Sequence, residues 1–399
     1  MNTARLLFSY LRARPLMTLL TALLVALGVA TVTIVTLVTK QADERMTRDA
    51  AGIDLVVGAK GSPLQLVLAG VYHLDVPPGN IPLTALAELR ANRLVASAVP
   101  LSLGDTFRGF RIVGTEPTFL ALYRARIALG EPFREPMQAV LGAQVAAATG
   151  LTLGGRFTGS HGLAPGGPEH GDETYTVVGV LAPSGGVIDR LVLTPLESVW
   201  LTHEGTPADE AEREALEAER EITLALVRYA SPIAAATLPR AINASDRLQA
   251  ASPSFESARL FRLVGVGVDG LRAFGALLLA TAALSVFVAL FQALSDRRRE
   301  LALMRLLGAS PARLFALLLG EGLLLTAIGV VLGLALGHGA VELAGQWLGR
   351  HGDFTLTGAE FDTIELVAAG VALGLGGLAA LVPAWLGART PLAGALSED

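Results

Sequence analysis

The sequence contains no cysteine and only two lysines, and charged residues make up 17% of it. Without cysteine, disulfides and thiolate metal sites are excluded. The phosphate-binding pattern G-x-x-x-x-G-K-[ST], the zinc-protease pattern H-E-x-x-H and the hydrolase pattern G-x-S-x-G are also missing. The fragment GAKGSP at 58–63 has the wrong order for a phosphate loop. We therefore expect no catalytic centre in this chain and no nucleotide or other cofactor bound to it.

The low charge is concentrated in four apolar windows. A soluble globular chain usually carries about 25% charged residues, and about 20 apolar residues are enough to cross the hydrocarbon core of a bilayer. Glu321 is the single charged residue inside these windows, which are Met17–Val38, Ala273–Leu294, Leu314–Gly337 and Leu366–Leu386. We predict four membrane spans.

These windows have two other interpretations. Four buried helices of a soluble core would normally be shorter and would each show a polar face. A cleavable signal peptide could account for the first window, because Arg5, Arg12 and Arg14 precede it. However, its uncharged run exceeds the usual 7–15 residues of a signal-peptide core, and no convincing cleavage site follows before TKQADERM. We therefore interpret the first window as an uncleaved span.

The distribution of arginine predicts the orientation, since cytoplasmic loops are enriched in basic residues. Arginines are dense before the first span and between the second and third, at 297–299, 305 and 313. Between the third and fourth spans, Arg350 stands alone among five acidic residues. The N-terminus, the 295–313 loop and the C-terminus are therefore predicted to be cytoplasmic. Residues 39–272 and 338–365 are predicted to be outside.

The basic segment 296–310, with the sequence DRRRELALMRLLGAS, is predicted to be a short amphipathic helix at the cytoplasmic membrane surface. Leu301, Met304 and Leu307 recur at helical spacing. Gly308 suits the left-handed position that ends a helix, and Ser310 with Pro311 suits the start of the next one. The alternative is a solvated basic loop that only obeys the charge rule.

The run RRRELALMRLLGASPARLFALLLGEGLLLTAIGVVLGLALG resembles the permease core of the FtsX-like, MacB-like family of ABC transporter subunits. The closing segment LVPAWLGARTPLAGAL resembles the last span of that family. The order RIVGTEPTFLALY, GEPF, AVLGAQVAAATGLTLGGRF, YTVVGVL and LVLTPLESVW resembles its periplasmic domain. The segment SHGLAPGGPEHGDE, at 160–173, departs from the family pattern.

The resemblance implies an α+β membrane protein with four transmembrane helices and a large mixed α/β periplasmic domain inserted between helices 1 and 2. Its parts would be a cytoplasmic N-terminus with the first helix at 1–38, the periplasmic core domain at 39–265 and the permease domain at 266–399. It also implies a bacterial inner-membrane location, a homodimer or paralogous permease pair, and a separate cytoplasmic ABC ATPase that binds ATP. Membrane lipid and a periplasmic adaptor or substrate protein are further expected partners; nucleic acid is not.

Within this scheme, contact with the ATPase is assigned to the predicted surface helix. The assigned residues are Arg297, Arg298, Arg299, Glu300, Met304 and Gly308. Glu321 is a separate candidate, because an ionisable residue inside a span is often functional. A hydrogen-bonded acid near the inner interface is the other interpretation of Glu321.

The outside segment is predicted to contain strands and helices in two subdomains. LTALAELRAN is a predicted helix, AVLGAQVAAATG a predicted helix ended by Gly150, and PADEAEREALEAEREI a third. TYTVVGVLA, TLALVRYA and RLVLTPLESVW are predicted strands.

Histidines in the outside segment are weak candidates for metal binding. His161 and His170 lie near Asp172 and Glu173, a zinc-compatible set of ligand types. The spacing matches no tight motif, and loops rich in glycine and proline are common without a metal. His73 is interpreted as a loop histidine with satisfied hydrogen bonds. We expect no metal site.

The predicted function is conformational work in the periplasm driven by ATP hydrolysis in a partner, with export or extrusion of a peptide, drug or lipid-like substrate. Extraction of lipid or lipoprotein, regulation of a periplasmic hydrolase, and a metal-linked receptor are the alternatives.

Overall fold

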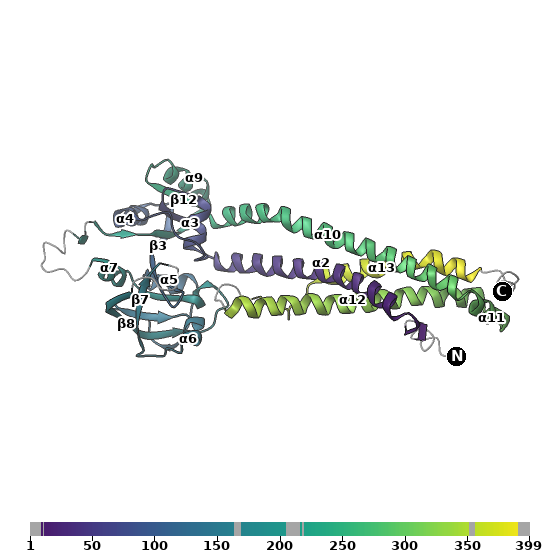
Figure 1. Ribbon diagram of the computed structural model, residues 1–399. Coiled ribbons are helices and arrows are strands. Elements are labelled where there is room, and N and C mark those ends of the chain that lie inside the picture. The colour runs from purple at the N-terminus through teal and green to yellow at the C-terminus, as the bar shows by residue number, and fades with distance from the viewer. Residues whose placement is uncertain are drawn as a thin grey trace. The chain divides into compact units, whose positions relative to one another are not determined.

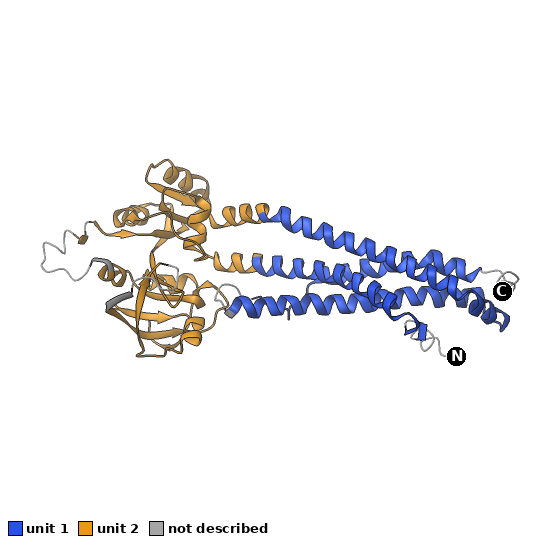
Figure 2. Ribbon diagram, viewed as in Figure 1, with its two compact units in different colours: residues 1–42, 264–399 blue, residues 43–263 orange. Residues whose placement is uncertain are grey.

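A computed structural model of the chain describes residues 9–10, 12–162, 169–204, 216–217, 219–350 and 356–389. The chain divides into two compact units, one of residues 1–42 and 264–399 and the other of residues 43–263 (Figure 2). The first is called the membrane unit and the second the strand-rich unit.

Among the described residues, four helices are long and apolar enough to cross a membrane. They are α2 (Pro15–Asp49), α10 (Pro253–Asp296), α12 (Pro311–Arg350) and α13 (Thr363–Ala388) (Figure 1). All four predicted spans are confirmed. α10 and α12 have 44 and 40 residues, about twice what a bilayer core requires. Both helices therefore continue beyond the hydrocarbon region.

Small residues let the helices of the membrane unit approach closely. Gly329, Gly333 and Gly337 of α12 face α2, where side chains added to them would meet Val25, Val29 and Thr33. Gly376 of α13 similarly faces Thr326 of α12. Helix packing in membranes depends on such close backbone contact, because lipid tails remove the hydrophobic drive between helices.

Gly333→Ala is expected to destabilise the membrane unit by about 1–3 kcal/mol, the usual cost of overpacking. The new Cβ would lie 2.7 Å from both the Ala26 carbonyl oxygen and the Val29 Cβ. The matched control is Gly339→Ala in the same helix, where nothing lies within 4 Å. Thermal unfolding in detergent should show a lower midpoint for Gly333→Ala only. Equal midpoints for the two variants would contradict the packing described.

The strand-rich unit contains twelve strands among its described residues. They are β1 (Leu55–Ala59), β2 (Ile81–Pro82), β3 (Val95–Phe107), β4 (Phe110–Thr115), β5 (Ile127–Gly130), β6 (Gln138–Leu141), β7 (Arg156–His161), β8 (Glu169–Leu181), β9 (Leu191–Pro195), β10 (Glu221–Ile222), β11 (Leu224–Tyr229) and β12 (Leu248–Ala251). The short helices between them are α3 (Pro63–Gly70), α4 (Leu83–Ala91), α5 (Thr118–Leu122), α6 (Ala143–Thr149), η1 (Val187–Arg190), α7 (Leu196–Glu204) and α9 (Pro232–Asn243).

Ten of these strands form one sheet in the order β12-β1-β11-β3-β4-β9-β6-β8-β5, with β7 paired to both β3 and β8. β3 joins two parts of this sheet. Its first half pairs with β11 and its second half with β4 and β7, with an irregularity between Leu103 and Thr106. The pairs β4–β9 and β6–β8 are parallel. The mixed α/β fold inserted after the first helix is thus confirmed.

One predicted helix is partly wrong. In AVLGAQVAAATG, the first three residues, 139–141, belong to β6, and the helix begins only at Ala143. Ala139, Val140 and Leu141 are fully buried, which favours a central strand over an exposed first helical turn. Gly150 ends the helix with a φ of 72°, as predicted. Most of the predicted helix PADEAEREALEAEREI lies outside the described residues, and its last residues form β10.

Candidate functional site

The basic segment between α10 and α12 forms α11 (Arg298–Leu306), shorter than the predicted 296–310. Gly308 has a φ of 94°, and its N–H donates to the carbonyl of Arg305 at 3.0 Å. The N–H of Ala309 donates to the carbonyl of Met304 at 2.9 Å. These two bonds are the pair that closes a helix in the Schellman motif. The prediction that Gly308 ends this helix is confirmed.

The start of α12 also follows its prediction. The backbone N–H of Arg313 donates to the Ser310 hydroxyl at 3.3 Å, and Pro311 is the first helical residue. A serine cap and a proline at the first position both favour a helix start. α11 and α12 are therefore joined by a defined turn rather than by an irregular basic loop.

α11 has one buried face and one exposed face. Leu301 and Ala302 are buried, and Leu301 packs with Leu294, Leu314 and Leu318 while Met304 lies against this cluster. The prediction that Leu307 shares this apolar face is wrong: Leu307 is 89% exposed, because the helix ends before it. The exposed side chains of the segment are Arg298, Arg299, Glu300, Leu303, Leu306 and Leu307.

Arg297 belongs to the interior of the membrane unit and not to the exposed face of α11. Its Nη1 lies 3.3 Å from each carboxylate oxygen of Glu321, and both side chains are less than 10% exposed. Its Nη2 donates to the Tyr10 carbonyl at 3.3 Å, and the guanidinium stacks 3.9 Å from the Tyr10 ring centroid. Three segments therefore meet here through one arginine: the residues before α2, the α10–α11 junction and α12.

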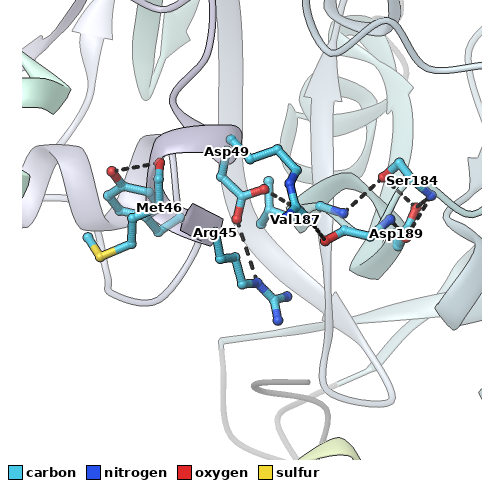
Figure 3. A network of polar contacts seen from close by, with 10 residues as sticks. Arg45, Met46, Asp49, Ser184, Val187 and Asp189 are labelled. Atoms are coloured by element: carbon cyan, nitrogen blue, oxygen red, sulfur yellow. Dashed lines mark hydrogen bonds and ion pairs between the residues drawn. The ribbon is translucent and has the colours of Figure 1, made fainter. Parts of the chain in front are cut away.

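A second polar cluster lies in the strand-rich unit, where the last turn of α2 contacts the loop before β9 (Figure 3). The Val187 N–H donates to Asp49 Oδ1 at 2.8 Å, and Arg45 lies 3.8 Å from the other carboxylate oxygen. Arg48 donates to the Gly185 carbonyl at 3.2 Å. Asp49 is 4% exposed, so this contact is sheltered from water.

The loop that receives Asp49 is itself held in place. Asp189 accepts hydrogen bonds of 2.8–3.0 Å from the Ser184 N–H, the Ser184 hydroxyl and the Gly185 N–H. Figure 3 shows Asp189 on the far side of the loop from Asp49. Gly185 has a φ of 72°, a conformation that glycine adopts without strain. These hydrogen bonds fix the conformation of the loop that precedes β9.

Tyr72 connects the last turn of α2 with the first turns of α10. Its hydroxyl lies 2.6 Å from the Ser257 hydroxyl and 3.4 Å from the Met46 carbonyl. Burial raises the pKa of Tyr72, so the phenol stays protonated and available as a donor. The Tyr72 side chain therefore forms hydrogen bonds with both α2 and α10, the two long helices that enter the strand-rich unit.

His73 is not the hydrogen-bonded loop histidine expected from the sequence. It is 4% exposed, and neither ring nitrogen has a hydrogen-bond partner among the described residues. Burial, with the charges of Arg111 and Arg190, lowers its pKa to about 3, so the ring is neutral. Burial likewise lowers the pKa of Arg111 to about 10.

The metal candidates are only partly described. His161 Nδ1 lies 3.1 Å from Asp105 Oδ1, and the His161 side chain is 44% exposed. Across the described part of the chain, no group of three or more histidine, cysteine, aspartate or glutamate side chains is placed to hold a metal ion. The side chains of His170 and Asp172 lie outside the described residues.

The sequence interpretation missed the contact partners of Arg297, Glu321 and Asp49. A signal existed for the first two, because a lone acid in a span and an arginine at the end of another span are natural partners. Asp49 gave no local signal, because its partner is a backbone N–H 138 residues later.

Comparisons with known proteins match both parts of the chain. The MacB-like periplasmic core domain family matches residues 18–245, and the FtsX-like permease C-terminal family matches residues 272–392. The periplasmic region of MacB from Actinobacillus actinomycetemcomitans is similar at 11% identity and a TM-score of 0.36, over 54% of this chain and 95% of that one. The extracellular domain of the noncanonic ABC-type transporter YknZ from Gram-positive bacteria is similar at 14% identity and a TM-score of 0.31, over 50% of this chain and 98% of that one. No curated protein matches the chain.

Proposed function

Because this chain belongs to the family of ABC transporter permeases that carry a MacB-like periplasmic core domain, we propose that a separate cytoplasmic ATPase drives it. It is a multi-pass inner-membrane protein with a periplasmic domain, and such permease domains are not catalytic. In the proposal, ATP is bound and hydrolysed by the partner. The permease carries the resulting movement along α2 and α10 to the periplasmic domain.

The observation that carries this proposal is the geometry of α11. Leu301 and Ala302 anchor the helix on α12, while Arg298 and Glu300 are exposed beside the apolar side chains of Leu303 and Leu306. A mixed face of apolar and charged groups on a firmly held helix is typical of a surface that docks a protein partner. In the proposal, a displacement of α11 by the ATPase also displaces α12, because the short hydrogen-bonded turn between the two helices allows little independent movement.

The outer junction supports the second half of the route. Asp49 and Arg48 bind the loop before β9, and Tyr72 lies between α2 and α10. Movement of either helix is therefore delivered to the sheet of the periplasmic domain. We propose export or extrusion of a peptide, drug or lipid-like substrate as the work performed, by a homodimer or a pair with a paralogous permease.

Arg297 is reassigned within this proposal. Its guanidinium is occupied by Glu321 and Tyr10, so we propose that it holds α11 and α12 together rather than contacting the ATPase. Arg298, Arg299 and Glu300 keep their proposed role as partner contacts. Met304 supports the helix from its half-buried side.

The test combines the purified chain with its cognate ATPase in nanodiscs. The chain alone is expected to hydrolyse no ATP, and the pair is expected to do so. Arg298→Ala and Glu300→Ala should each weaken binding of the ATPase about 10- to 100-fold, since a charge-assisted contact contributes about 1.5–3 kcal/mol. Gly308→Val should be worse than Gly308→Ala, because a β-branched residue tolerates positive φ poorly.

The matched control is Arg272→Ala, which removes an exposed arginine from α10. It is expected to leave ATPase binding and hydrolysis at wild-type values. Wild-type behaviour of Arg298→Ala, Glu300→Ala and Gly308→Val at equal membrane levels would contradict the proposed role of α11. ATP hydrolysis by the chain alone, with contaminants removed, would contradict the permease proposal itself.

A further inference from the structure

A half-buried histidine and a buried glutamate meet where α12 approaches the start of α13. His338 Nε2 lies 2.7 Å from Glu365 Oε2, and His338 Nδ1 lies 2.7 Å from the Gly358 carbonyl oxygen. The Glu365 side chain is fully buried and the His338 side chain is 20% exposed. The Phe361 ring stacks on the imidazole with 5.3 Å between centroids. All of these residues belong to the membrane unit.

The hydrogen-bond geometry fixes the number of protons in the pair. The Gly358 carbonyl can only accept, so Nδ1 of His338 must carry a proton. Nε2 and Oε2 at 2.7 Å then need a second proton between them, because an imidazole lone pair and a carboxylate repel each other. The pair is therefore either an imidazolium with a carboxylate or a neutral imidazole with a carboxylic acid.

The second carboxylate oxygen of Glu365 is already occupied. Oε1 accepts the Asp362 N–H at 3.0 Å, as part of a capping box at the start of α13. No water reaches this side chain, so an ionised Glu365 without the shared proton would be a buried charge opposite an acceptor. A buried, unpaired carboxylate raises the free energy of the docked state. Separation of His338 from Glu365 would expose the carboxylate to water and lower that free energy.

The contact also holds the loop 356–362 against α12 and α2. Gly358 lies so close to the His338 carbonyl that a side chain at this position would collide with it. The Gly358 N–H donates to Glu342 Oε2 of α12 at 2.9 Å. Gln41 of α2 exchanges two hydrogen bonds with Thr357, of 2.8 and 2.9 Å. Release of the loop would therefore free the outer part of α2.

The other charged groups around the pair have their own partners. Lys40 of α2 lies 2.8 Å from Asp362, which also caps α13. Glu342 of α12 is held by the Gly358 N–H and by Thr357 and Gln346. Glu360, on the loop itself, is exposed. In each of these contacts one partner is already a hydrogen-bond donor. The His338–Glu365 contact differs from them, because it requires a proton shared between two acceptor atoms.

We propose that His338 and Glu365 form a proton-binding site that keeps the loop 356–362 docked on α2 and α12. In the docked state the pair holds two protons, one on Nδ1 of His338 and one shared between Nε2 and Glu365. In the released state, with a neutral histidine and an ionised glutamate, the pair holds one proton. Docking is therefore favoured at lower pH and is lost as the pH rises, by up to about tenfold per pH unit for one linked proton.

The test measures hydrogen exchange of the backbone amides in the full-length chain in nanodiscs from about pH 6 to about pH 9, the range around histidine titration. Thr357 and Gly358 have N–H groups whose acceptors lie on α2 and α12, across the docked contact. After correction for the intrinsic pH dependence of exchange, wild-type protection of these amides is expected to fall at least tenfold. Amides of β1 in the strand-rich unit are the internal reference and should not change.

Glu365→Gln is the matched variant. Its amide N–H can donate to the neutral Nε2 of His338 while its oxygen still accepts the Asp362 N–H, so docking no longer needs the shared proton. Protection in this variant is expected to vary less than about twofold over the same range. Glu365→Ala, which loses both contacts, should leave the loop weakly protected at every pH.

Two results would overturn the proposal. Flat protection in the wild type would leave His338–Glu365 as a structural contact only. An equal fall in the wild type and in Glu365→Gln would assign the titration to another group, such as Glu342 or Asp362. The measurement needs no ATPase and no cargo, so its outcome is independent of the proposed transport function.

Discussion

Replacing Arg297 by alanine is expected to destabilise the membrane unit by about 3–5 kcal/mol, the usual cost of removing one partner of a buried ion pair. Glu321 would be left as a buried carboxylate without its neighbour at 3.3 Å. The stacking of the guanidinium on Tyr10 would be lost as well, which removes about 0.5–2 kcal/mol more. SDS titration of the chain in detergent micelles, followed by helical circular dichroism, measures the loss.

Two controls separate the cost of an unpaired charge from the value of the pair. The double variant Arg297→Leu with Glu321→Leu leaves no charge unpaired and is expected to lie within about 1.5 kcal/mol of the wild type. Arg272→Ala breaks an ion pair on α10 whose side chains are 55% and 74% exposed, and it should change stability by less than about 0.5 kcal/mol. If the double variant is as unstable as Arg297→Ala, the pair itself, and not the orphaned charge, stabilises the bundle.

Replacing Asp49 by alanine is expected to loosen the loop before β9 and to destabilise the periplasmic domain by about 1–3 kcal/mol. The Val187 N–H would lose its acceptor at 2.8 Å, and an unsatisfied buried donor costs about this much. The local effect should be larger than the global one: amides at 184–190 should exchange at least tenfold faster. Urea unfolding and hydrogen exchange measure the two effects separately.

Asp49→Asn is the conservative control, because its side-chain oxygen still accepts from Val187 and only the pairing with Arg45 weakens. Asp246→Ala removes an exposed acid from the same unit and should have no effect on the loop. With the ATPase present, Asp49→Ala should retain hydrolysis but transfer less movement to the periplasmic domain. Unchanged exchange at 184–190 in Asp49→Ala would contradict the junction described.

Local patterns in the sequence were sufficient to predict the spans and one turn. Hydropathy located four helices, since a bilayer requires a long apolar run whatever its neighbours are. Gly308, Ser310 and Pro311 predicted the α11–α12 turn, because cap and turn residues act on their own backbone. The placement of Leu307 on the apolar face was wrong, because helical spacing alone does not show where a helix ends. α11 ends at Leu306, one residue before Leu307.

Contacts between distant segments could not be predicted in this way. The arginine at 297 was assigned to the surface because it begins a basic run, yet its side chain is buried. Glu365 was counted only as an acid of an outside loop, whereas it is the buried cap of α13 and the partner of His338. Strand order could not be predicted for a related reason. β3 pairs with β11 more than a hundred residues later, and pairing over that separation leaves no local pattern in the sequence.

The packing of α2 against Gly333 has a consequence for how the protein is made. The contact joins Ala26 to a residue about 300 positions later, which a ribosome adds about 15–60 s afterwards at about 5–20 residues per second. Until α10 is synthesised, α2 must remain in the bilayer without a partner helix, which its internally satisfied backbone permits. α10 then packs on α2 through Leu279 and Ala282, before α12 is made. The large domain is translocated and begins to fold while the helix bundle of the membrane unit is still unfinished. We therefore expect the periplasmic domain to begin folding before the helix bundle is assembled. The glycine face of α12 packs on α2 late in this sequence.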